Sequence, residues 1–261
     1  MNLDSVPLWA VFLATVVLVM LSVEVGYRFG GSAHRRSQDE KEAPVSGVSG
    51  AVLGLTAFIL AFTFAIVTER YDTRKGLVRQ DANAIRVAYF RADFLPETDR
   101  TESKRLLAAY LDTRLQFVRA NSVEPTQVQA AIATSEKIQR RLWAIAVNNA
   151  GRDMNSDVAA LYIESLNDMV AVHADRIAIG VQARLPIGMW AVLYSLMTLG
   201  MFSVGYHAGI AGSNRSKAMV ILAASFALVM VMVAALDRPG SAVRITQQPL
   251  QDLRTFMATP E

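Results

Sequence analysis

Residues 45–68, VSGVSGAVLGLTAFILAFTFAIVT, run without a single charged side chain and decide the fold. A helix needs roughly 20 apolar residues to cross a hydrocarbon core of about 30 Å, so this run is long enough to span a membrane. The sequence then continues through Tyr71–Phe94 with many charges but no helix breaker. We therefore expect one long helix that leaves the membrane and ends before Pro96, since proline disfavours a helical conformation at the residue before it.

Three further runs have the length and polarity of membrane spans. In residues 218–236, nine Val, Ile, Leu or Phe side chains together favour insertion by about 4 kcal/mol. The first run resembles a signal peptide in position, but residues 1–5 hold no Lys or Arg and the run exceeds the 7–15 residues of a signal core. The sequence therefore predicts four transmembrane helices, at about residues 6–27, 45–68, 185–206 and 218–236.

Residues 69–184 differ from the rest of the chain, because they hold 17 of the 26 basic and 15 of the 23 acidic residues. Apolar side chains recur at three- and four-residue steps, which is typical of amphipathic helices. One predicted stripe leads into the third span: Val158, Leu161, Ser165, Met169, Val172, Arg176 and Ile179. The predicted fold is all-α, with transmembrane hairpins at 1–68 and 185–236, a helical extramembrane domain at 69–184 and a tail at 237–261.

The composition agrees with a membrane protein and excludes several functions. The chain is 52% hydrophobic and only 19% charged, whereas soluble domains average about 25% charged residues. The absence of Cys excludes disulfides, iron–sulfur clusters and a thiol nucleophile. Three scattered His residues predict no metal site, and the net charge of +3 is too small to indicate nucleic-acid binding.

No catalytic motif is present, so we expect neither an enzyme nor a cofactor. The sequence has no Walker-type phosphate loop, no HExxH, no GxSxG and no GxGxxG. Gly205, Gly209 and Gly212 have the wrong spacing for a dinucleotide fingerprint, and we expect them in the loop between the third and fourth spans.

The second span carries the first group of candidate site residues. Phe58, Phe62 and Ile66 step by four, so they form one apolar stripe. Such a stripe either faces lipid and packed protein or forms a hydrophobic constriction that gates a pore. Gly50 and Gly54 form a GxxxG pair, which lets two helices approach closely in lipid.

Charged residues follow this span at once and form a second candidate group. Glu69, Arg70 and Arg74, with Asp81 beyond them, fit either a solvated helix face or a charged collar at an ion entry path.

Two long motifs resemble those of the bacterial bestrophin-like domain family. The first is residues 69–96, ERYDTRKGLVRQDANAIRVAYFRADFLP, and the second is residues 236–253, LDRPGSAVRITQQPLQDL. The family usually has Glu where Asp81 stands and Gly-Thr at positions 86–87. The tail motif places five residues of this chain in the family pattern: Asp237, Arg238, Pro239, Pro249 and Leu250.

The resemblance extends more distantly to bestrophins, which are pentameric ion channels whose second span lines the pore with an apolar neck. It implies that Phe58 and Phe62 occupy the two Phe positions of that neck, and that Gly54 falls at its first position. It implies a homo-oligomer, a pentamer, whose partners are the lipid bilayer and inorganic ions. The bestrophin calcium clasp has no match here. The competing interpretation is a non-conducting membrane scaffold or sensor whose helical domain binds a partner.

Charge alone leaves the membrane orientation open. The two hairpin loops, 28–44 and 207–217, carry six Lys or Arg, whereas the opposite side carries nine close to the membrane. Short loops weigh more in the positive-inside rule. The density of Lys and Arg therefore places the hairpin loops in the cytoplasm, whereas their number places the opposite side there.

The resemblance predicts that residues 69–184 and both termini lie in the cytoplasm of a bacterial inner-membrane protein. A reporter enzyme that works only in the periplasm should therefore be inactive when it is fused after Glu261. An active reporter at that position would reverse the predicted orientation and leave the four spans intact.

Overall fold

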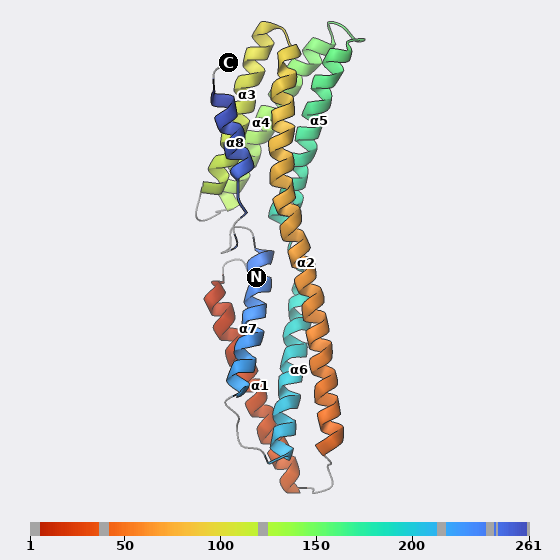
Figure 1. The fold of residues 1–261 in the computed structure, drawn as a ribbon, viewed down its shortest axis with the longest axis vertical. Coiled ribbons are helices and arrows are strands. Elements are labelled where there is room, and N and C mark those ends of the chain that lie inside the picture. The colour runs from red at the N-terminus through yellow and green to blue at the C-terminus, as the bar shows by residue number, and fades with distance from the viewer. Residues whose placement is uncertain are drawn as a thin grey trace. The chain divides into compact units, whose positions relative to one another are not determined.

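The computed structural model describes residues 6–36, 42–119, 125–212, 218–238, 243 and 245–259, and in these ranges all regular structure is helical (Figure 1). The chain divides into two compact units. Unit 1 comprises Met1–Arg70 and Arg184–Ser241, and unit 2 comprises Tyr71–Ala183 and Ala242–Glu261.

Unit 1 contains the four predicted spans, which are confirmed as helices long and apolar enough to cross a membrane. They are α1 (Leu8–Arg36), the first part of α2 (Glu42–Arg91), α6 (Ile187–Ile210) and α7 (Ala218–Asp237). Helix α2 is one element of 50 residues, as the unbroken sequence after the second span predicts. Helix α1 continues beyond the predicted span to Arg36.

Glycines bring the backbones of α1 and α6 into direct contact. A Cβ on Gly26 would lie 2.0 Å from the carbonyl oxygen of Phe202, and one on Gly205 would lie 2.1 Å from that of Val23. A Cβ on Gly30 or Gly209 would meet backbone at 2.2 or 2.4 Å. Only glycine fits at such a distance, which is how small residues pack helices in lipid.

This packing corrects one expectation from the sequence. Gly205 and Gly209 do not lie in the loop between the third and fourth spans, because α6 continues to Ile210. Their spacing of four residues places both on one face of α6, against α1. Gly212 does lie in a turn, with a positive φ of 59° that favours glycine.

Another face of α6 packs against α2. The Ser49 hydroxyl lies 2.7 Å from the Ser203 hydroxyl, and the Thr56 hydroxyl donates to the Leu196 carbonyl at 3.2 Å. Between these two contacts, a Cβ on Gly200 would lie 3.2 Å from the Leu53 side chain. The polar side chains in this contact are all hydrogen-bonded, as burial in lipid requires.

Unit 2 is a helical bundle made of the second part of α2 with α3 (Glu97–Arg119), α4 (Pro125–Ala150), α5 (Asp157–Ile177) and α8 (Gln248–Ala258). Short 3₁₀ and π segments, η2 (Ala92–Phe94) and η3 (Ala178–Gln182), follow α2 and α5. The core is made of large fully buried side chains, and among them are Ile85, Leu107, Leu111, Leu142 and Leu166. The tail helix α8 completes the bundle by burying Leu250 and Leu253, while Arg254 forms an ion pair with Asp112 at 2.6 Å.

The contact between α1 and α6 predicts a selective effect of a single methyl group. Gly205→Ala should lower the unfolding temperature, because the Cβ collides with backbone that cannot rotate away, at a cost of about 1–3 kcal/mol or more. Gly188→Ala is the matched control in the same helix, since a Cβ there meets nothing within 4 Å. Tryptophan fluorescence during heating in detergent measures the unfolding temperature of both variants. Equal unfolding temperatures for the two variants would contradict the proposed backbone contact.

Candidate functional site

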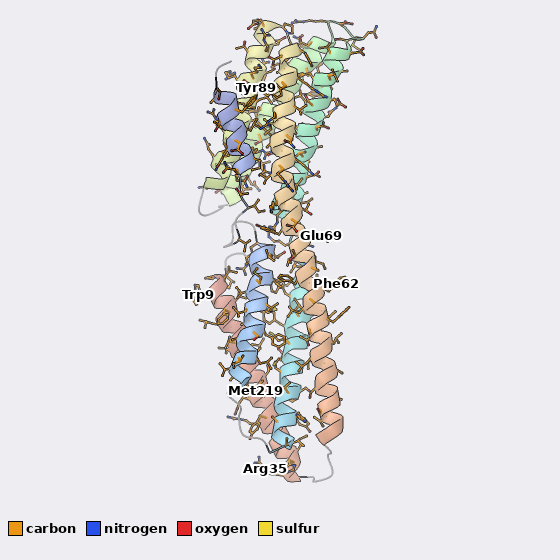
Figure 2. All side chains as sticks on the ribbon, in the orientation of Figure 1. Trp9, Arg35, Phe62, Glu69, Tyr89 and Met219 are labelled. Atoms are coloured by element: carbon orange, nitrogen blue, oxygen red, sulfur yellow. The ribbon has the colours of Figure 1, made fainter. Side chains whose placement is uncertain are left out.

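The two phenylalanines of the predicted stripe project from α2, and among the described residues the ring contact of each is with the other. Phe58 is 64% exposed and Phe62 is 62% exposed, and their rings stack on each other with centroids 6.4 Å apart. Figure 2 shows the Phe62 side chain directed away from the other helices of this unit. Ile66, one turn further along the stripe, is partly buried.

The same exposed face of α2 continues through Gly50 and Gly54. A Cβ on either glycine would meet nothing within 4 Å among the described residues, so no described helix of this chain packs closely there. The opposite face is buried at Thr56, Thr63 and Val67. Helix α2 in unit 1 therefore has one face packed against its own chain and one face that the described part of the chain leaves open.

The charged residues after the span lie in different environments. Glu69 is exposed. Arg70 lies 3.6 Å from the carboxylate of Asp237. Arg74, in unit 2, is only 8% exposed. Of the three predicted mouth charges, Glu69 is thus the one whose side chain is open to solvent in the single chain.

Asp237, from the predicted tail motif, links three segments of unit 1. Its carboxylate accepts a hydrogen bond from the backbone N–H of Leu185 at 2.9 Å and lies beside Arg70, although Asp237 itself is buried. The next residue, Arg238, donates to the carbonyl of Val6. The end of α7 is thereby joined to the segments that precede α6 and α1. Pro239 lies outside the described residues, whereas Pro249 lies in the first turn of α8 and Leu250 of the same helix is buried.

A buried ionic cluster lies in the core of unit 2. The carboxylate of Asp81 on α2 is fully buried and contacts the guanidinium of Arg176 on α5. Arg114 on α3 approaches the same carboxylate oxygen at 3.5 Å. Two cations thus share one anion, which leaves an excess positive charge inside the bundle. Within the part of the chain that the structure describes, the other carboxylate oxygen of Asp81 is buried without a hydrogen-bond partner.

His173 and Tyr110 extend this cluster. The guanidinium of Arg114 donates to the Tyr110 hydroxyl and to Nδ1 of His173, and Gln139 donates to the same hydroxyl at 3.2 Å. Because arginine can only donate, Nδ1 accepts and the neutral ring carries its proton on Nε2. Burial, together with the charge of Arg114, lowers the pKa of His173 to about 4. Burial also raises the pKa of Tyr110 and lowers that of Arg176.

Most of this cluster was absent from the sequence predictions. Asp81 was expected beside Arg74, seven residues away, but its carboxylate contacts Arg176, 95 residues distant in sequence. One signal was present, since Arg176 stands within a predicted apolar stripe, where a charged residue requires a buried partner.

Comparisons with known proteins bear on the family and the fold. A family model of the bestrophin-like domain matches residues 12–250. No curated protein matches the chain.

Several solved structures share the fold at low sequence identity. A point variant of a bacterial bestrophin homologue from Klebsiella pneumoniae is 13% identical, with a TM-score of 0.63 over 96% of this chain and 97% of that chain. A structure of a bestrophin homologue from Klebsiella pneumoniae phased with zinc is 16% identical, with a TM-score of 0.58 over 95% and 94%. A point variant described as a membrane protein is 15% identical, with a TM-score of 0.60 over 96% and 94%.

The low pKa of His173 predicts an acid-sensitive fold. Between pH 6.5 and about 4 the unfolded chain takes up a proton at this position and the folded chain does not, so stability falls as the pH falls through this window. His173→Asn should make stability depend less on pH in this window, because Asn keeps a hydrogen-bond acceptor for Arg114 but does not titrate. Unfolding temperatures measured from pH 4 to pH 8 provide the comparison. An unchanged slope in the variant would assign the acid sensitivity to other groups.

Proposed function

The chain belongs to the bestrophin-like domain family, and from this membership we propose that it is one subunit of an oligomeric ion channel. It is an integral membrane protein with four apolar helices. In this proposal, residues 69–184 are the helical domain between the second and third spans, and this domain and both termini are cytoplasmic. The pore lies on the symmetry axis of the oligomer and is lined by α2.

The observation that carries the proposal is the open face of α2. Phe58 and Phe62 are both more than half exposed, although they belong to the helix whose opposite face is firmly packed on α6. Copies of α2 arranged around an axis would turn these side chains into two stacked rings. A narrow ring of Phe side chains repels water, and a dry constriction blocks ions until it widens.

The residues on either side of the rings fit the same arrangement. Glu69 follows Phe62 by seven residues, about 10 Å along the helix, and its exposed carboxylate would influence ions that approach the neck. Ile66 lies between them on the stripe. Gly54 supplies no ring one turn before Phe58, so the proposed neck contains fewer apolar rings than a bestrophin neck.

Truncation of both rings tests the neck. The double variant Phe58→Ala and Phe62→Ala should raise basal conductance severalfold in planar bilayers, because the constriction loses its apolar side chains while the packed face of α2 is untouched. The matched control is Leu199→Ala with Leu228→Ala, which removes two equally exposed apolar side chains from α6 and α7.

Conductance that rises in both double variants would point to general disturbance of the membrane part rather than to a neck. A protein that is monomeric in detergent and never conducts would overturn the channel proposal. It would favour instead a membrane scaffold whose helical domain binds a partner.

A further inference from the structure

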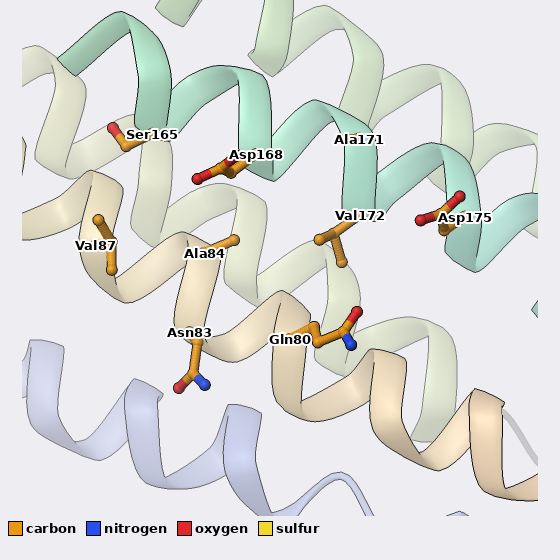
Figure 3. Close-up of a pocket in the computed structure, with 9 residues that line it drawn as sticks. All are labelled: Gln80, Asn83, Ala84, Val87, Ser165, Asp168, Ala171, Val172 and Asp175. Atoms are coloured by element: carbon orange, nitrogen blue, oxygen red, sulfur yellow. The ribbon is translucent and has the colours of Figure 1, made fainter. Parts of the chain in front are cut away.

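Unit 2 has a groove between α2 and α5 that the described part of the chain does not fill. The groove has a volume of about 370 Å³, which is in the range of small-molecule sites, and Figure 3 shows residues from both helices lining it. Its apolar lining includes Ala84 and Val87 on α2 and Ala171 and Val172 on α5. Val87 is 40% exposed, so part of this lining faces water and would gain from an apolar cover.

Two ionic contacts between α2 and α5 hold the walls of the groove in place. Arg91 on α2 pairs with Glu164 on α5 at 2.9 Å and donates to the Leu161 carbonyl at 2.6 Å. Nearer the start of α2, Asp81 contacts Arg176 on α5. The two helices therefore run antiparallel, and every α5 residue that lines the groove lies between Glu164 and Arg176. The groove is thus formed before any ligand arrives.

The α5 edge of the groove carries two carboxylates. Asp168 and Asp175 both line it and both are exposed. They are seven residues apart, which is about 10 Å along the helix, and Ala171 and Val172 lie between them (Figure 3). Arginines neutralise the carboxylates beyond either end of this edge, whereas no ion pair involves Asp168 or Asp175 among the described residues. Two uncompensated negative charges therefore stand at the ends of an apolar strip.

This spacing limits the chemistry of a ligand that uses both carboxylates. Oxygen ligands lie within about 2.0–2.6 Å of a bound Mg²⁺ or Ca²⁺, so carboxylates on helical positions about 10 Å apart do not share one ion. The described residues also contain no group of three or more His, Cys, Asp or Glu side chains that could hold a metal. The matching ligand has a positive charge at each end and an apolar chain between them.

We propose that the groove binds an extended aliphatic diammonium ion, a molecule of the polyamine class. One ammonium group would pair with Asp168 and the other with Asp175, while the methylene chain covers the apolar strip. Gln80 and Asn83 on α2 also line the groove, and their amide oxygens can accept further N–H groups. Exposed ion pairs contribute little on their own, so most of the affinity would come from the buried methylenes.

The site itself goes beyond the proposed channel, but its effect on ion flow rests on that proposal. Helix α2 is one continuous element, and Val87 follows Phe58 by 29 residues, which is about eight turns of the helix. The proposed function turns this face of α2 toward the axis. A bound dication would then stand beside the ion path and repel other cations.

Calorimetric titration of the full-length protein in detergent at low salt tests the site with 1,8-diaminooctane. This diamine should bind at least tenfold more tightly than Mg²⁺ or 1,3-diaminopropane, whose charges are too close together to reach both carboxylates and which bury fewer methylenes. Equal affinities for the three cations, or no binding of 1,8-diaminooctane, would overturn the proposal. Binding of a lysine-rich peptide without binding of the diamine would also overturn it, and would assign the groove to a basic protein segment.

Isosteric variants locate the binding. Asp168→Asn and Asp175→Asn should each weaken binding of 1,8-diaminooctane about threefold, and both together about tenfold, because each removes one exposed ion pair. The matched control is Asp153→Asn, which removes an exposed carboxylate outside the groove and keeps an acceptor for the N–H of Asn155. Equal weakening in the control would reduce the effect to net charge and overturn the site.

Bilayer recordings distinguish this proposal from the channel proposal. Added to both sides, 1,8-diaminooctane should lower the current severalfold, and the double Asp variant should need about tenfold more of it. A protein that conducts but does not bind the diamine would overturn the site and leave the channel standing. A protein that binds it with the expected variant pattern but never conducts would overturn the channel and leave the site. A current that bound diamine does not change would overturn the placement beside the ion path.

Discussion

The backbone contact between α1 and α6 is the constraint on which unit 1 depends. Since Gly26 and Gly205 let the two helices touch without side chains between them, one face of α6 is committed to α1. The Ser203 and Leu196 side of α6 then receives α2 through Ser49 and Thr56. These hydrogen bonds fix the rotation of α2 about its axis, so Phe58 and Phe62 are turned to the open side. The candidate neck is thus a consequence of packing elsewhere in the unit.

Unit 2 is organised by a different interaction, the burial of Asp81 between two arginines. A buried carboxylate with a single guanidinium is already costly to desolvate, and a second cation is tolerated only because Tyr110 and His173 accept hydrogen bonds from it. Removal of the anion would leave Arg114 and Arg176 facing each other in a dry core. The cluster therefore ties α2, α3 and α5 together through polar contacts that have few alternative partners, which favours one arrangement of the bundle.

The sequence predicted the elements well and the contacts between them poorly. Hydropathy located the four spans and the long helix α2, because membrane crossing imposes length and polarity on a local stretch of chain. Gly205 and Gly209 were misassigned to a loop because glycine is a breaker in water but a packing residue in lipid. Val158 and Leu161, predicted in the apolar stripe of α5, are in fact 45% and 40% exposed, while His173 and Arg176 on the same helix are largely buried. A polar side chain joins a core only through partners from other helices, and one sequence does not reveal these.

The open face of α2 makes no demand on an assembly by itself. Exposed Phe58 and Phe62 would be equally stable in lipid, because a bilayer is as apolar as a protein core, so their exposure alone does not require a partner. An oligomer with α2 at its axis therefore has to be held together by contacts other than those of the neck. Residues of the proposed neck are in that case free to suit permeation, since they do not have to hold the subunits together.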